Sequence, residues 1–130
     1  MARKLLSLLL GVGVLVSAAP VVAHHSEAAE YDASKPVKVT GVITKVEWLN
    51  PHVWFYVDVK DASGKVTTWG FSNAPPGALM RRGITKDRLK IGSEVTVEGV
   101  RAKDGSNNAS GRRVTYPDGT NALTATEGAK

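Results

Sequence analysis

Three histidines are the side chains of this sequence best suited to chemistry. His24 and His25 are adjacent and follow an apolar N-terminal segment, and His52 follows the turn-forming residues 49–51. If a peptidase removes residues 1–23, His24 carries a free α-amine and an imidazole, and these two nitrogens can chelate one metal ion. A second imidazole, from His52 or His25, completes a three-nitrogen site, and nitrogen-rich planar ligand sets favour Cu(II) or Ni(II). The histidines therefore predict a site for copper or another divalent metal.

The beginning of the chain predicts export. Arg3 and Lys4 precede an apolar run over residues 5–16, and small residues lead to Ala23. This pattern is typical of a cleavable secretory signal peptide, and the run is shorter than the about 20 residues that cross a bilayer. We expect cleavage after Ala23 and a periplasmic mature protein, the alternative being a retained membrane anchor. Cleavage after Val22 would instead place a histidine third from a free amine, which is another copper-binding arrangement.

A simpler interpretation of the same histidines is open. His24 and His25 then form a solvated start of the mature chain, and His52 anchors the turn after Pro51. The acidic residues that follow, among them Glu27 and Glu30, predict an extended polar arm over residues 24–36. Thirteen residues extend to roughly 40 Å, so the arm can return to His52 but does not have to.

Aromatic side chains surround His52 in the predicted sheet. Residues 52–60 alternate strictly between apolar and other side chains, which predicts a half-buried strand with Trp54 and Tyr56 on the face of His52. Trp69 lies on the following strand. Trp54, Tyr56 and Trp69 therefore form a candidate ligand-binding face that could hold a peptide or glycan by stacking. The alternative is that some of these rings close one end of the domain.

Composition excludes several classes of function. The chain has no cysteine, which removes disulfides and zinc–thiolate sites. Loss of Arg3 and Lys4 with the signal peptide lowers the formal net charge from +5 to +3, which is too small to predict a nucleic-acid partner. No catalytic motif is present, so we expect a binding protein and not an enzyme.

Basic side chains gather in the region between the third and fourth predicted strands. They are Arg81, Arg82, Lys86, Arg88 and Lys90. This basic cluster is either a solvated face or a surface that contacts an anionic part of the cell envelope.

The elements that must position these residues are mostly β-strands. We predict strands over residues 37–48, 52–60, 66–71, 94–101 and 112–116, with a change of phase at Gly41 that indicates a bulge or a strong bend. A short helical insert lies between the third and fourth strands. This order predicts a small five-stranded OB-like barrel, with an open β-sandwich as the alternative. The predicted organisation is a signal peptide (1–23), an N-terminal arm (24–36), the barrel (37–123) and a disordered tail (124–130).

Several short motifs carry a resemblance to a known family. They include His24-His25-Ser26, Gly41-Val42-Ile43-Thr44-Lys45-Val46-Glu47-Trp48, Asn50-Pro51-His52, Leu79-Met80-Arg81-Arg82-Gly83 and Gly92-Ser93-Glu94-Val95-Thr96-Val97. On these motifs the chain resembles a family of small exported bacterial proteins of unknown function, over residues 23 to about 123. The resemblance implies export and no assigned activity. The predicted architecture is also distantly similar to periplasmic OB-type copper and silver chaperones. Those proteins bind their ions through methionines, whereas the expected mature chain has a single methionine, Met80.

The predicted function is that of a small exported binding module. Its ligand is copper or another divalent metal held by the mature N-terminus. The alternative is an envelope protein, peptide or glycan held by the aromatic face.

Overall fold

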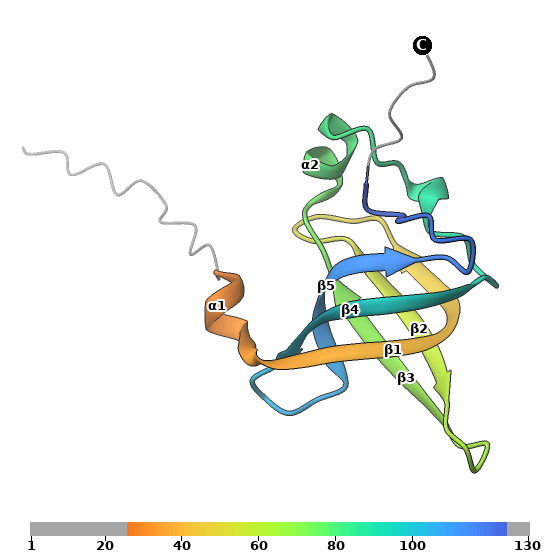
Figure 1. The fold of residues 1–130 in the computed structure, drawn as a ribbon. Coiled ribbons are helices and arrows are strands. Elements are labelled where there is room, and N and C mark those ends of the chain that lie inside the picture. The colour runs from red at the N-terminus through yellow and green to blue at the C-terminus, as the bar shows by residue number, and fades with distance from the viewer. Residues whose placement is uncertain (1–25, 125–130) are drawn as a thin grey trace, which may run out of the picture.

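The computed structural model describes residues 26–124 and is mostly β, as the sequence predicts (Figure 1). A four-residue helix α1 (Glu27–Glu30) leads directly into β1 (Tyr31–Glu47), which is followed by β2 (Trp54–Lys60) and β3 (Val66–Ser72). Helix α2 (Pro76–Arg81) and the 3-10 turn η1 (Lys86–Arg88) separate these strands from the last two, β4 (Glu94–Ala102) and β5 (Asn108–Thr115).

The five strands form one sheet that closes on itself in the order β1-β2-β3-β5-β4. The long β1 pairs with β4 through Val42 and with β2 from Val42 onward, so it belongs to both sides of the ring. The β3–β5 contact that completes the ring is short and parallel, over Gly70–Ser72 and Asn108–Ser110. The other strand pairs are antiparallel.

Alternating apolar residues fill the inside of this ring. Val53, Phe55 and Val57 are fully buried, and the ring centroids of Phe55 and Phe71 lie 5.3 Å apart. Leu79 from α2 and Ile84 cover one opening of the ring, and both are 1% exposed. The helical insert therefore closes the core instead of extending away from it.

The structure corrects the predicted N-terminal arm. Residues 27–36 are not an extended arm, because α1 occupies 27–30 and β1 begins at Tyr31, six residues before the predicted start. Residues 32–36 include no large apolar side chain, so the sequence did not indicate this part of the strand. Tyr31 is 8% exposed, pairs with Ala102 and packs with it and Val100, so the start of the strand lies against the sheet.

Two further strand details differ from the prediction. The register of β1 shifts between Ile43 and Lys45, not at Gly41. Strand β5 begins at Asn108, four residues before the predicted start. Its first inward positions are Ala109 and Gly111, and Gly111 lies against the ring of Phe55 and the Cβ of Phe71. Only small residues fit beside these two large side chains, so the strand lacks the alternation of large apolar residues that would have indicated it.

Within residues 26–124, no helix has the length and apolar character needed to cross a membrane. The predicted signal peptide, His24, His25 and the tail after Thr124 lie outside the described residues.

Candidate functional site

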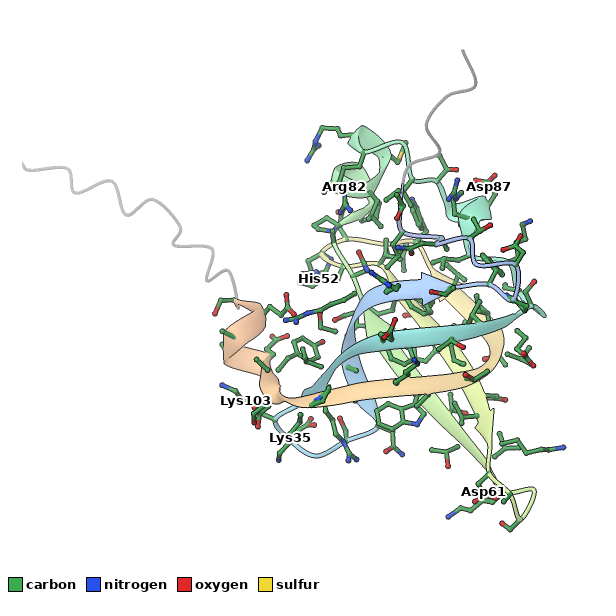
Figure 2. The ribbon with its side chains drawn as sticks, viewed as in Figure 1. Lys35, His52, Asp61, Arg82, Asp87 and Lys103 are labelled. Carbon is green, nitrogen blue, oxygen red and sulfur yellow. The ribbon has the colours of Figure 1, made fainter. Side chains whose placement is uncertain are left out.

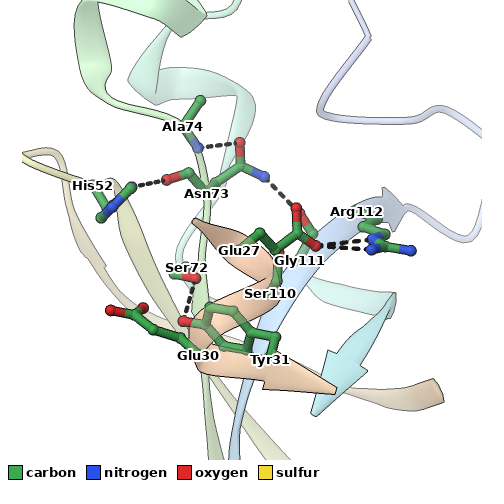
Figure 3. A pocket seen from close by; sticks show the side chains of 10 residues that line it. All are labelled: Glu27, Glu30, Tyr31, His52, Ser72, Asn73, Ala74, Ser110, Gly111 and Arg112. Atoms are coloured by element: carbon green, nitrogen blue, oxygen red, sulfur yellow. Dashed lines mark hydrogen bonds and ion pairs between the residues drawn. The ribbon is translucent and has the colours of Figure 1, made fainter. Parts of the chain in front are cut away.

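A cavity of about 300 Å³ lies between α1, the end of β3 and β5 (Figure 3). It brings together residues that are far apart in the sequence. His52 and Asn73 line it from the loops beside β2 and β3, and α1 contributes two carboxylates. The lining residues are Glu27, Glu30, Tyr31, His52, Ser72, Asn73, Ala74, Ser110, Gly111 and Arg112.

His52 is held in one tautomer by the backbone. Its Nδ1 lies 3.0 Å from the carbonyl oxygen of Asn73. A carbonyl oxygen can only accept a hydrogen bond, so Nδ1 donates and carries the proton. In the neutral ring the lone pair is then on Nε2. A metal-binding histidine commonly has this arrangement, with one ring nitrogen bonded to a carbonyl and the other available to the ion.

Asn73 joins the three segments around His52. Its backbone N–H donates to Val53, and its side-chain Nδ2 donates to the carbonyl of Gly111 on β5 at 2.7 Å. Its Oδ1 accepts the N–H of Ala74. The carbonyl that orients His52 is therefore fixed by bonds on both sides, and the imidazole is positioned by the sheet even though the residue is exposed.

The opposite wall of the cavity is polar and charged. Nε and Nη2 of Arg112 both donate to Oε1 of Glu27, at 3.2 and 2.9 Å. Beneath them the Tyr31 hydroxyl and Ser72 Oγ share a buried hydrogen bond of 2.6 Å. Burial raises the pKa of the Tyr31 phenol above its ordinary value, so this hydroxyl stays protonated at neutral pH.

Helix α1 is attached to the sheet at several points. Besides the ion pair with Arg112, Nζ of Lys103 donates to the carbonyl of Ala28 at 2.6 Å, and the backbone N–H of Lys103 donates to Glu30. Figure 2 shows Lys103 beside α1, on the loop that follows β4. These bonds place the start of the described chain at the cavity that His52 lines.

No group of three or more histidine, aspartate or glutamate side chains between Ser26 and Thr124 is arranged to hold a metal ion. The described part of the predicted metal site is thus His52, with Nε2 as the nitrogen open to a ligand. The other predicted ligands, His24 and His25, immediately precede the first described residue, Ser26.

The predicted aromatic face is only partly assembled. Trp54 and Tyr56 lie together on the outer surface of β2, with ring centroids 6.4 Å apart. Trp69 does not join them: it pairs with the inward-facing Val57, packs against Phe71 and the core, and lies beneath the guanidinium of Arg101. The pairing register places Gly70, not Trp69, opposite Tyr56, and alternation along a single strand does not record that register.

The five residues of the predicted basic cluster separate into two groups. Nη2 of Arg82 donates to the carbonyl of Leu123, and Nη2 of Arg88 donates to the carbonyls of Asn121 and Thr124. These two side chains therefore hold the C-terminal segment, which explains their presence without an anionic partner. Arg81, Lys86 and Lys90 are exposed.

Sequence reasoning did not identify Asn73 or Arg112 as site residues. Asn73 resembled a turn residue beside two prolines, and Arg112 resembled the solvated start of a strand. Their roles depend on tertiary contacts with His52 and Glu27, 21 and 85 residues away in the chain. No local pattern could have indicated either residue.

Comparison with known proteins supplies a family and no activity. No curated protein and no solved structure matches the chain. A model described as a family of unknown function (DUF6152) matches residues 12–112, which include His52, Trp54, Tyr56 and most of the sheet. The chain therefore belongs to this family of unknown function, DUF6152.

Proposed function

We propose that this protein is an exported, OB-like binding module that holds a copper ion between its mature N-terminus and His52. The amine and imidazole of His24 supply two nitrogens, and Nε2 of His52 supplies a third. His25 is the competing imidazole. The module binds its ion and carries out no reaction. The order of three strands, a helical insert and two strands supports the OB-like description.

One observation carries the proposal: Glu27 and His52 line the same cavity. His24 is three residues from Glu27, and three residues extend to about 10 Å. A mature chain that begins at His24 is therefore long enough for its amine and imidazole to reach the cavity that His52 lines. The sequence alone required a long arm to return to His52, whereas α1 and the start of β1 already make that return.

The tautomer of His52 suits a divalent cation. His52 has its lone pair on Nε2, and copper prefers imidazole and amine nitrogens. Glu27 lies on the cavity wall and adds negative charge, although Arg112 offsets it. Because protons compete with the metal ion for the nitrogen ligands, binding weakens in acid.

The test is a Cu(II) titration of protein that begins at His24, compared with the same protein acetylated at its N-terminus. We expect one equivalent to bind the free-amine form and acetylation to weaken binding by about an order of magnitude or more, because it removes one nitrogen ligand. Acetylation is the appropriate block, since added residues could create a new copper motif with a histidine in third position. Nitrogen couplings in the electron paramagnetic resonance spectrum report how many nitrogens bind the metal.

His52→Gln and His25→Gln are matched variants for the third ligand. We expect His52→Gln to remove one nitrogen from the spectrum and His25→Gln to leave the spectrum unchanged. Loss of a nitrogen only in His25→Gln would place the site on the N-terminus alone. Equal binding by the acetylated and free proteins would show the proposal to be wrong.

A further inference from the structure

A second candidate site, independent of the metal proposal, lies on the outer surface of β2. Trp54 and Tyr56 are two residues apart on this strand, and their ring planes differ by 21°. Both side chains are half-buried although they face away from the core. We call this pair of rings the aromatic platform.

Gly70 is the reason that the rings lie down on the sheet. It pairs with Tyr56 on the neighbouring strand β3. A Cβ at Gly70 would lie 3.3 Å from Cε1 of Tyr56, 3.4 Å from Cζ3 of Trp54 and 2.5 Å from Oδ1 of Asn108. The position is therefore covered by the two rings and the Asn108 amide. The platform therefore extends from β2 over Gly70 of β3, and the two strands lie side by side in Figure 1.

Polar groups border the platform on both sides. Lys45 and Glu47 of β1 pair with Tyr56 and Trp54 in the register, and their ammonium and carboxylate lie 2.7 Å apart. The Tyr56 hydroxyl donates to Glu47 at 3.3 Å, and Nζ of Lys45 lies 5.5 Å from the centre of the Tyr56 ring. Asn108 of β5 forms the opposite border.

We propose that the aromatic platform binds a neutral carbohydrate chain. The apolar C–H face of a pyranose ring matches a flat aromatic surface, and its hydroxyl groups match the carboxylate and amide at the borders. A sugar that lies over Trp54 and Tyr56 places hydroxyls within reach of Glu47 on one side and Asn108 on the other. Two rings along one strand suit successive sugar units better than one isolated sugar.

The charges at the border favour a carbohydrate over the other ligands that stack on aromatic rings. A nucleic-acid strand needs cations along its phosphates, but here Lys45 is already paired with Glu47, and Asp58 adds a second carboxylate on the same face. A peptide that adds to a sheet binds through unpaired backbone groups at an edge, whereas β2 is paired on both sides at Trp54 and Tyr56. A neutral ligand with many hydroxyls meets neither obstacle.

The experiment measures quenching of tryptophan fluorescence and ¹⁵N chemical-shift changes with cellohexaose, chitohexaose and maltohexaose as probes. An oligothymidylate and a proline-rich peptide test the other two ligand classes. We expect at least one hexasaccharide to bind at micromolar to millimolar concentration and to shift the Trp54 indole and Gly70 amide signals. Trp54→Ala should weaken this binding about tenfold, and Tyr56→Ala about fivefold.

Ile91→Ala is the matched control, because it removes an exposed apolar side chain outside the platform. It should leave saccharide binding unchanged. Gly70→Ala keeps both aromatic residues, but its Cβ displaces the Asn108 amide at the border of the platform and crowds the Tyr56 ring, so it should weaken binding while the chemical shifts of core residues persist. Lack of binding by all three saccharides, binding only of the peptide or oligothymidylate, or equal binding by Trp54→Ala and the unchanged protein would overturn the proposal. Because acetylation of the N-terminus does not affect this platform, failure here and failure of the copper site are distinguishable.

Discussion

At the scale of single residues, short polar motifs determine much of the local structure. Asp32, Asp61 and Asp104 are each followed two positions later by a serine, and each carboxylate accepts the serine N–H at 2.9 Å and its hydroxyl at 2.6 Å. The serine hydroxyl is the main cause that lowers the pKa of each of these aspartates. Asp61 forms its turn at the tip of the β2–β3 hairpin (Figure 2). These contacts are local, and a sequence motif is sufficient to specify them.

The Tyr31–Ser72 bond is a residue-scale contact that no local motif indicates. Tyr31→Phe removes the hydroxyl and leaves Ser72 Oγ without this partner in a site where Ser72 is 7% exposed. We expect the free energy of unfolding to fall by about 1–3 kcal/mol, because an unpaired buried hydroxyl is costly. Urea unfolding followed by tryptophan fluorescence measures the loss.

Ser72→Ala completes a double-mutant cycle for this prediction. The double variant should be more stable than the sum of the two single losses indicates, since it removes both polar groups together. Strictly additive losses would show that the two hydroxyls do not interact. The raised pKa of Tyr31 adds a pH dependence: its stabilising contribution is present below pH 10.0 and is lost as the pH rises through the folded-state pKa. Tyr31→Phe should not show this component of alkaline destabilisation.

At the scale of elements, β1 pairs first with β4 and then with β2, and Gly41 lies where its partner changes. Val42 pairs with both Glu94 of β4 and Asp58 of β2. At Gly41 the backbones come so close that a Cβ would lie 2.1 Å from the carbonyl oxygen of Asp58. The glycine that the sequence indicated as a bulge is thus required for close approach, and the register shift occurs two residues later.

Gly41→Ala should therefore disturb the β1–β2 pairing. We expect a loss of about 1–3 kcal/mol or more in the free energy of unfolding, because a backbone atom, not a flexible side chain, must move. Gly77→Ala is the matched control in α2. Its nearest neighbour would be Nη1 of Arg81 at 3.5 Å, so the change should be neutral or stabilising by under about 1 kcal/mol. If urea unfolding gave equal midpoints for the two variants, the close approach at Gly41 would not limit stability.

At the scale of the whole molecule, the C-terminal segment completes the core of the ring. Ala122 is fully buried, and Leu123 is 7% exposed. The N–H of Ala122 donates to Val114 of β5, and Arg82 and Arg88 donate to carbonyls of the same segment. Figure 1 shows this segment beside η1 and α2 at one end of the sheet. The last described residues are therefore part of the folded domain.

Leu123→Ala tests how much this segment contributes. We expect a loss of about 2–5 kcal/mol in the free energy of unfolding, because the change leaves a cavity in the core. Leu49→Ala makes the same substitution at a residue that is 64% exposed and should change stability by no more than about 0.5 kcal/mol. Thermal unfolding by calorimetry compares the two variants. A loss of the same size in both would place Leu123 outside the cooperative core.

The sequence by itself determined the β class, and it indicated the order of the five strands and the residues that we propose as ligand-binding. Strict alternation over residues 53–59 and the turn motifs are local properties, so they indicate strands and turns before any tertiary contact forms. Tertiary structure alone decided which of these residues meet. It placed His52 beside α1, separated Trp69 from Trp54 and Tyr56, and began β1 and β5 earlier than their side chains indicated. The physical reason is that pairing register and the packing of small residues under large rings depend on partners tens of residues away, which no local pattern records.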